Sequence, residues 1–195
     1  MAVPVLYFIR HGETDWNVEG RLQGQSDIPL NDVGRVQADQ AGRKLRDIMA
    51  RPEDLPWLVS PLARTRETAE RARRAIGLPS VSYQIDDRLK ELTFGAWEGH
   101  TWKELRRVDN AGVEARFADK WGYVPPDRAE SYAMLRDRIA GWLEHVDRDS
   151  IVVSHGGVAR VLFVILTGMN PDEAADAPIW QGKLIVFREG RADWV

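Results

Sequence analysis

Cysteine is absent from the 195 residues of this chain. A chain without cysteine has no disulfide framework and cannot use a thiolate as nucleophile or metal ligand. Long hydrophobic runs are missing too, since no apolar stretch approaches the ~20 residues of a membrane-spanning helix. The chain does not open with the basic-then-apolar pattern of a signal peptide. We therefore expect a cytoplasmic protein that does not associate with membranes.

Positive charge is not in excess. The chain has 27 lysines and arginines against 30 aspartates and glutamates, a formal net charge of −3. This balance argues against a nucleic-acid-binding surface. Hydrophobic residues make up 44% and charged residues 29%, an ordinary composition for a globular protein. Because no linker, low-complexity tract or repeat interrupts the chain, we expect a single domain over residues 1–195. We expect the protein to be a monomer or a homodimer.

Five short runs have the composition of β-strands. Val3–Ile9, Trp57–Val59 and Ile151–Val153 are rich in apolar β-branched and aromatic residues, as is typical of the buried strands of parallel sheets. Val81–Ile85 alternates apolar and polar residues and is predicted to be an edge strand. Lys183–Phe187 is predicted to be the last strand.

Helical patterns lie between these runs. The predicted helices are 33–48 after the N-cap residue Asn31, 61–76 after the N-cap residue Ser60, 130–146, and about 158–167. Strands that alternate with helices predict an α/β fold, here a three-layer α/β/α sandwich with a mostly parallel sheet.

Three segments lack a clear period. Residues 16–30 are predicted to be a loop, and 87–99 to be mostly irregular. Residues 100–128 show weak helical character and a Pro125-Pro126 break, and we expect this segment to cap the functional site. Long loops in compact domains tend to carry function.

Histidines and arginines follow the predicted strands where they end. His11 comes after Arg10 at the end of the first run, and His155 comes after the run that ends at Val153. Arg64 follows the strand 57–59. The carboxyl ends of parallel strands meet at one edge of a sheet, so these side chains could converge there. Two histidines and two arginines would suit a phosphoryl dianion, because the guanidinium fork matches phosphate.

Other readings of this pattern are weaker. The arginines would repel a metal cation, and no third ligand has suitable spacing, so we predict no metal. The chain also lacks the Gly-rich loop ending in Lys-Ser/Thr that a P-loop nucleotide site needs. We expect no organic cofactor. The alternative is that these arginines and histidines are exposed to solvent and bind nothing, and the further motifs described next argue against it.

Four motifs resemble the histidine phosphatase superfamily, which contains the cofactor-dependent phosphoglycerate mutases and broad-specificity phosphatases. The resemblance runs from residue 5 to about 166 and leaves the middle segment and the last thirty residues unsupported. The motifs are Arg10-His11-Gly12-Glu13-Thr14 with Asn17, Ser60-Pro61-Leu62-Ala63-Arg64-Thr65-Arg66-Glu67-Thr68-Ala69, Glu91-Leu92-Thr93-Phe94-Gly95-Ala96-Trp97-Glu98-Gly99, and Ser154-His155-Gly156-Gly157.

The resemblance implies a phosphoglycerate mutase-like fold and a role for each motif. His11 resembles the family's nucleophile, which takes the phosphoryl group on a ring nitrogen. Glu91 resembles the residue that protonates the leaving oxygen, with Glu13 and Glu98 as competing candidates. Residues implied to hold the phosphoryl group are Arg10, Arg64 and His155, and those implied to touch the phosphoryl group or the ester are Asn17, Gln23, Gly24 and Gly156.

The implied function is hydrolysis of a small phosphomonoester through a phosphohistidine on His11. The phosphatase branch is favoured because Phe94 stands where the mutases usually have tyrosine, and because residues 126–131 resemble the phosphatases' proline–glutamate–serine approach to a helix. The paired Arg106 and Arg107 are expected to face solvent. The alternatives are a cofactor-dependent phosphoglycerate mutase and a catalytically silent domain that binds a phosphorylated ligand.

Tryptophans offer one more candidate feature. Trp97, Trp102, Trp121 and Trp180 could line an apolar pocket for the leaving group, although tryptophan more often fills a core.

Overall fold

A six-stranded sheet forms the centre of the protein, whose computed structural model describes residues 4–195. The strands run in the order β3-β2-β4-β1-β5-β6. The strands β3, β2, β4 and β1 pair with one another in parallel, whereas β5 pairs antiparallel with both β1 and β6. The strands are β1 Leu6–Arg10, β2 Trp57–Val59, β3 Gln84–Ile85, β4 Ser150–Ser154, β5 Leu184–Arg188 and β6 Arg191–Trp194. Val3, the predicted start of the first strand, lies outside the described residues.

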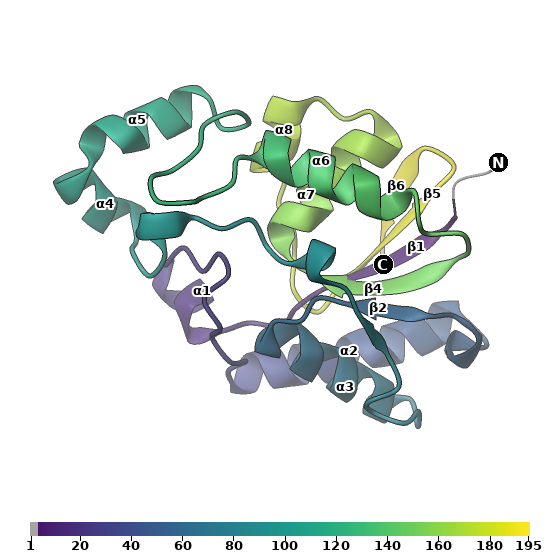
Figure 1. Cartoon of the computed structure of the whole chain (residues 1–195). Coiled ribbons are helices and arrows are strands. Elements are labelled where there is room, and N and C mark those ends of the chain that lie inside the picture. The colour runs from purple at the N-terminus through teal and green to yellow at the C-terminus, as the bar shows by residue number, and fades with distance from the viewer. Residues whose placement is uncertain (1–3) are drawn as a thin grey trace.

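Helices cover both faces of this sheet (Figure 1). One layer contains α2 (Asp32–Ile48) and α3 (Ala63–Ala75). The opposite layer contains α6 (Tyr132–Leu143), α7 (Gly156–Thr167) and the short α8 (Pro171–Asp176). The predicted three-layer α/β/α fold with a mostly parallel sheet is therefore confirmed.

Each face of the sheet has its own hydrophobic core. Leu45 of α2 and Ala69 of α3 pack with Ile9, Trp57 and Val153 of the strands. On the other face, strand residues such as Phe8 and Val152 pack with the helix residues Leu135, Trp142 and Leu162. Alternate side chains of β1 thus enter the two cores, as the two-residue period of a strand requires.

The carboxyl ends of β1, β2 and β4 all meet at one end of the sheet. Arg10 is in register with Ser154, and the His11 amide donates to the Ser154 carbonyl at 2.9 Å. Beyond this end lie α1 (Asp15–Glu19) and then α4 (Trp102–Val108) and α5 (Asn110–Ala118) (Figure 1). Three short 3-10 helices complete the fold: Pro52–Asp54, Asp87–Leu89 and Gly95–Trp97. No helix within residues 4–195 is long and apolar enough to cross a membrane.

The structure corrects the prediction that residues 16–30 are entirely loop. Helix α1 begins after Thr14, whose side chain accepts from the Asn17 amide, while the Asn17 side chain accepts from the Thr14 amide. This capping box, together with the left-handed Gly20 at the other end, defines the helix. Five residues are too few to show an apolar period, so the pattern did not reveal it.

The predicted start of α3 is also wrong. The helix begins at Ala63, and its N-cap residue Leu62 makes no side-chain capping bond. Ser60 is therefore not the N-cap, and its hydroxyl is used elsewhere. Two smaller differences concern the strands. The edge strand β3 covers only Gln84–Ile85, and β6, which pairs with β5 near the C-terminus, was not predicted.

Candidate active site

Two buried histidines stand side by side where β1 and β4 end. His11 is 3% exposed and His155 is fully buried, and their ring centroids lie 5.3 Å apart. Adjacent parallel strands in register place the residues that follow them next to each other. The expected convergence of these two side chains is thus what the fold produces.

The ring of His11 is neutral, with a defined tautomer. Its Nδ1 lies 2.7 Å from the carbonyl oxygen of Gly12, and because a carbonyl can only accept, Nδ1 carries the proton. Burial lowers the pKa of His11 well below its ordinary value of 6.5, and the charges of Arg64 and Arg10 lower it further. Nε2 therefore holds a lone pair, which a nucleophilic imidazole requires.

His155 is held by the hydroxyl of Ser60. The Ser60 Oγ and His155 Nε2 are 2.7 Å apart, which explains why Ser60 does not cap α3. Burial lowers the pKa of His155 well below 6.5, with Arg64, His11 and Arg10 adding to the effect. The other ring nitrogen, Nδ1, is buried without a hydrogen-bond partner among residues 4–195.

The two predicted arginines lie beside the histidines, Arg64 buried and Arg10 partly buried. Burial lowers the pKa of Arg10 to about 10, still far above neutrality, and one of its Nη groups donates to the carbonyl of Ile179. Arg64 is fully buried and donates through Nη1 and Nη2 to the carbonyls of Ser26 and Gly24, both at 2.7 Å. Each arginine therefore also holds a loop against the site.

A cavity of about 160 Å³ opens over these side chains. Eight of the nine predicted site residues line it, and the ninth, His155, is fully buried next to His11. The walls are Arg10, His11, Asn17, Arg21, Leu22, Gln23, Gly24, Arg64, Glu91, Leu92, Phe94, Tyr132, Gly156 and Arg160. Arg21 is paired with Glu19 and Glu104 outside the lining, and the remaining three arginines against one carboxylate make this a cationic space.

Unpartnered polar atoms are concentrated at this site. Within residues 4–195, four buried side-chain atoms lack a hydrogen-bond partner: Arg10 Nε, Arg64 Nε, His155 Nδ1 and Gln23 Oε1. All four belong to predicted site residues. Buried polar groups are normally paired, so such a cluster indicates a place where a ligand supplies the partners. Both arginine Nε groups are donors, which suits an anion.

Glu91 carries the one carboxylate in the lining of the cavity. Its Oε2 accepts from the Gly157 amide and its Oε1 from the Leu92 amide, both at 3.0 Å. A Cβ on Gly157 would come within 2.2 Å of Glu91 Oε1, so only glycine admits this carboxylate at the start of α7.

The two competing acids lie outside the cavity lining. Glu13 Oε1 accepts from Asn31 at 3.0 Å. Both oxygens of Glu98 accept hydrogen bonds that tie residues 25–26 to residues 93–94. Glu98 thus links two loops, and of the three candidate acids Glu91 is the one that lines the cavity.

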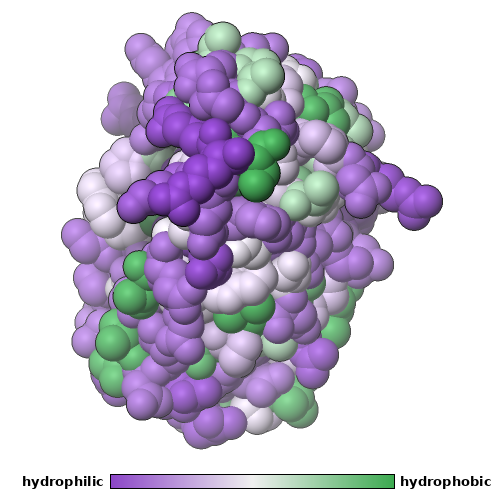
Figure 2. Space-filling view, turned by 90° about the vertical axis from the view of Figure 1, so that its left-hand side faces the viewer, coloured by the Kyte–Doolittle hydropathy of each residue, from purple (hydrophilic) through white to green (hydrophobic). Residues whose placement is uncertain are grey.

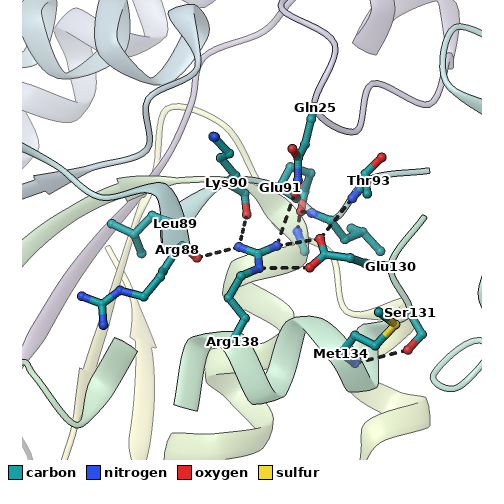
Figure 3. A network of polar contacts seen from close by, with 12 residues as sticks. Gln25, Arg88, Leu89, Lys90, Glu91, Thr93, Glu130, Ser131, Met134 and Arg138 are labelled. Carbon is teal, nitrogen blue, oxygen red and sulfur yellow. Dashed lines mark hydrogen bonds and ion pairs between the residues drawn. The ribbon is translucent and has the colours of Figure 1, made fainter. Parts of the chain in front are cut away.

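A second layer of polar contacts holds the backbone around Glu91 (Figure 3). Arg138 of α6 donates to the carbonyls of Arg88 and Lys90 at 2.6 and 2.9 Å. Its Nη2 and Nε also pair with the Glu130 carboxylate at 2.7 and 3.0 Å. Gln25 donates to the Glu91 carbonyl at 3.0 Å. These contacts immobilise the segment that carries the acid.

Helix α1 presents Asn17 to the cavity. The Asn17 Oδ1 accepts from the Thr14 amide and from Gln181 Nε2. Its Nδ2 group is the end of the side chain without a hydrogen-bond partner among residues 4–195, and Asn17 lines the cavity. Gly24 adopts a left-handed conformation with φ of 51°, and a Cβ there would lie 1.9 Å from Glu98 Oε1. The expected loop residues Asn17, Gln23 and Gly24 therefore all reach the cavity.

Six lining residues were not predicted as site residues: Arg21, Leu22, Leu92, Phe94, Tyr132 and Arg160. Arg160 of α7 lies one turn after Gly156, and a Cβ on Gly156 would lie 3.8 Å from its Nη1. Its Nη1 also donates to the Tyr132 hydroxyl at 3.1 Å. The four-residue spacing from Gly156 places Arg160 on the same helix face, a signal that could have revealed it. No comparable spacing to a predicted site residue indicates Tyr132.

The segment 100–128 and the four tryptophans do not line the cavity over His11. No residue of 100–128 lines the cavity over His11, although several line an adjoining one. Of the four tryptophans, only Trp102 reaches that second cavity. Trp97 is 2% exposed and packs with Leu105 and Val113, and thus fills a core. Arg106 and Arg107 are exposed, as expected.

Metal-ligating side chains do not gather in the described part of the chain. Residues 4–195 contain no group of three or more histidine, aspartate or glutamate side chains that could hold a metal ion.

Comparison with known proteins identifies the family. The model of the histidine phosphatase superfamily (branch 1) matches residues 6–195, and the chain belongs to this superfamily. It is 34% identical over 172 residues to the metal-independent phosphoserine phosphatase of Arabidopsis thaliana, covering 85% of this chain and 69% of that protein.

Solved structures of the same family have the same fold. The alpha-ribazole phosphatase from Shigella flexneri superposes with a TM-score of 0.80 at 27% identity, covering 93% of this chain and 89% of that one. A phosphoglycerate mutase from Thermus thermophilus gives 0.71 at 31% identity, covering 93% and 91%. Phosphatases and a mutase thus stand among the similar proteins.

Proposed function

We propose that this protein hydrolyses a small phosphomonoester through a phosphohistidine on His11. The observation that carries the proposal is the cluster of unpartnered buried atoms on Arg10, Arg64 and His155 around a neutral imidazole. A phosphoryl group has three oxygens to pair with such atoms. Its phosphorus would then face the His11 Nε2 lone pair.

The reaction has two steps in this proposal. Nε2 of His11 attacks phosphorus, the bond from phosphorus to the ester oxygen breaks, and the protonated Glu91 carboxyl gives its proton to that oxygen. The alcohol leaves. The Glu91 carboxylate then takes a proton from water as the water oxygen attacks the phosphohistidine, which releases phosphate and restores His11.

The surrounding residues stabilise the charges that develop. Arg10, Arg64 and His155 would pair with the equatorial oxygens of the in-line transfer. The Gly12 carbonyl, 2.7 Å from Nδ1, would stabilise the positive charge that the ring acquires once Nε2 bonds to phosphorus. No metal ion or organic cofactor has a role in this scheme.

Hydrolysis is favoured over the mutase reaction by the capping segment. The paired Arg106 and Arg107 are exposed on α4 and reach neither cavity. Two of the similar proteins are named as phosphatases, which supports hydrolysis of a phosphomonoester by this protein. A mutase is the second candidate, since the Thermus thermophilus protein has the same fold at similar identity.

The test is hydrolysis of p-nitrophenyl phosphate and a set of phosphorylated metabolites by the wild type and by His11→Asn. We expect phosphate release by the wild type and none by the variant. Equal release by both proteins would refute the proposed nucleophile. With 3-phosphoglycerate, formation of 2-phosphoglycerate in place of free phosphate would identify a mutase. Binding of phosphate without any turnover would identify a silent domain.

A further inference from the structure

The loop between α8 and β5, residues 177–183, lies against the catalytic cavity although it is outside the four sequence motifs. Arg10, which lines the cavity, donates to the Ile179 carbonyl of this loop. Asn17, which also lines the cavity, accepts a hydrogen bond from Gln181 Nε2 at 2.9 Å. The loop therefore contacts two residues of the predicted phosphoryl site.

The end of the molecule that carries α4 and α5 has a largely hydrophilic surface with small, separate hydrophobic spots (Figure 2). A broad apolar face for a partner is therefore not what this end offers. The side chains around the cavity are held by loops of the chain itself, and residues 177–183 are one of these loops.

The backbone on both sides of Gln181 is fixed by packing. Ile179, two residues earlier, is 4% exposed and packs in the core between the sheet and helices α6 and α7. Gly182, the next residue, has a left-handed φ of 71°, and a Cβ there would lie 3.2 Å from Cγ of Gln37 on α2. The side chain of Gln181 therefore reaches Asn17 from a defined position.

The orientation of the Asn17 amide is determined by three donors. Its Oδ1 accepts from the Thr14 backbone amide and the Thr14 hydroxyl, both at 3.1 Å, and from Gln181 Nε2. A backbone N–H can only donate, so the Asn17 atom that faces it is the oxygen. The Nδ2 group is then left to donate into the cavity, which suits a phosphoryl oxygen.

Helix α1, which carries Asn17, has little packing of its own. It is five residues long, none of its residues is buried, and its Val18 is 67% exposed. So short a helix is not stable by itself. Two of the donors to Asn17 come from the helix cap, whereas Gln181 lies 164 residues further along the chain. Gln181 thus ties the helix to a loop that is anchored in the core.

We propose that Gln181 is a positioning residue of the active site, which holds the Asn17 amide so that Nδ2 donates to the transferred phosphoryl group. The proposal rests on the proposed function, in which a phosphoryl group occupies the cavity. Gln181 is not part of the cavity lining, so it acts through Asn17 and not on the substrate.

A double-mutant cycle tests this positioning role with p-nitrophenyl phosphate. Gln181→Leu removes the donor at similar size and should lower kcat/KM by about 2- to 12-fold, as expected for one hydrogen bond. In the Asn17→Ala background the same change should have almost no effect, because the two residues act as one unit. In the Glu91→Gln background the losses should multiply, since Glu91 is held by other segments of the chain.

The kind of ester provides a second readout. Asn17 would act on the phosphoryl group, which alkyl and aryl phosphates share, so Gln181→Leu should slow phosphorylation by both to the same extent. A loss confined to alkyl phosphates would overturn the proposal, because it would place the effect on the proton donor.

The dependence on pH provides a third readout. Gln181→Glu keeps the size of the side chain, but an ionised carboxylate has no proton to donate to Asn17 Oδ1. Protonation restores a donor, so the ratio of variant to wild-type kcat/KM should rise as the pH falls from about 7 to about 4.5. Gln40→Glu is the matched control, since it adds the same charge at an exposed position on α2 and should show a constant ratio. Thermal unfolding at each pH verifies that the variants are folded.

The outcomes separate this proposal from the proposed function. Losses that multiply in the Asn17→Ala background would overturn the proposal and leave Gln181 a structural residue, as would a Gln181→Glu ratio that does not change with pH. If the wild type turns over no ester, the proposed function fails. Calorimetric titration of the four proteins of the Asn17 cycle with inorganic phosphate then decides the positioning role by the same criterion of non-additivity.

Discussion

Replacement of Glu91 by glutamine separates proton donation from binding. The change keeps the size of the side chain but removes the transferable proton. Alkyl phosphates leave as alkoxides that need a proton, whereas p-nitrophenolate leaves readily without one. We therefore expect Glu91→Gln to slow phosphorylation by alkyl esters far more than phosphorylation by p-nitrophenyl phosphate.

The contacts of Glu91 set the size of the effect. Its two oxygens each accept a backbone amide at 3.0 Å, and a glutamine can offer an oxygen to only one of them. The lost hydrogen bond costs about 0.5–1.5 kcal/mol, or roughly 2- to 12-fold, and applies equally to both kinds of ester. Loss of general acid catalysis adds about 10²–10⁴-fold for the alkyl esters alone.

Single-turnover phosphorylation rates measure both contributions. The phosphoenzyme should also accumulate in the variant, because activation of water is impaired as well. Glu13→Gln is the control, since Glu13 lies outside the lining of the cavity and should tolerate the change. An equal loss for both ester types would refute the assignment of Glu91 as the acid and leave it a structural residue.

Three further predictions concern the two histidines and the proposed independence from metal ions. Ser60→Ala removes the hydroxyl that lies 2.7 Å from His155 Nε2, so both ring nitrogens of His155 would be buried without a partner. This should lower the free energy of unfolding by about 1–3 kcal/mol, and an unchanged urea midpoint would contradict the prediction. Because the folded-state pKa of His11 lies well below 6.5, the unfolded state binds a proton at this histidine before the folded state does as the pH falls. The free energy of unfolding should therefore be unaffected by His11 above about pH 6.5 and should decrease below it. Urea midpoints at about pH 5 and 7.5 should show this decrease, and the decrease should be smaller in His11→Asn. EDTA should leave activity unchanged while vanadate inhibits, and activity lost on chelation and restored by zinc or magnesium would argue for a metal-dependent reaction.

The parts of the fold predicted from sequence are those that a local pattern determines. Continuous apolar runs revealed β1, β2 and β4. The polar residues at the end of these strands or directly after them, Arg10, His11 and His155, follow in position from the strands. Parallel pairing alone then brings the two histidines together. The strand pattern therefore located the two histidines and the two arginines, whereas Glu91 and the loop residues were indicated only by the resemblance to the family's motifs.

The features that were missed depend on contacts between distant residues. Ser60 looks like an N-cap locally, but its hydroxyl pairs with a histidine 95 residues away. Helix α1 is defined by caps and not by a period. Helix α5 lies in a weakly periodic segment, where Val113 packs against Trp97 and Leu105. No spacing in the chain indicates that packing.

Trapping the covalent intermediate tests the central claim most directly. Wild type and Glu91→Gln are mixed with substrate, denatured in alkaline detergent, digested and analysed by mass spectrometry. We predict one phosphoryl group on His11, stable in base, lost in acid and absent from His11→Asn. A phosphoryl group on His155, or none on any residue while phosphate is being released rapidly, would contradict the mechanism.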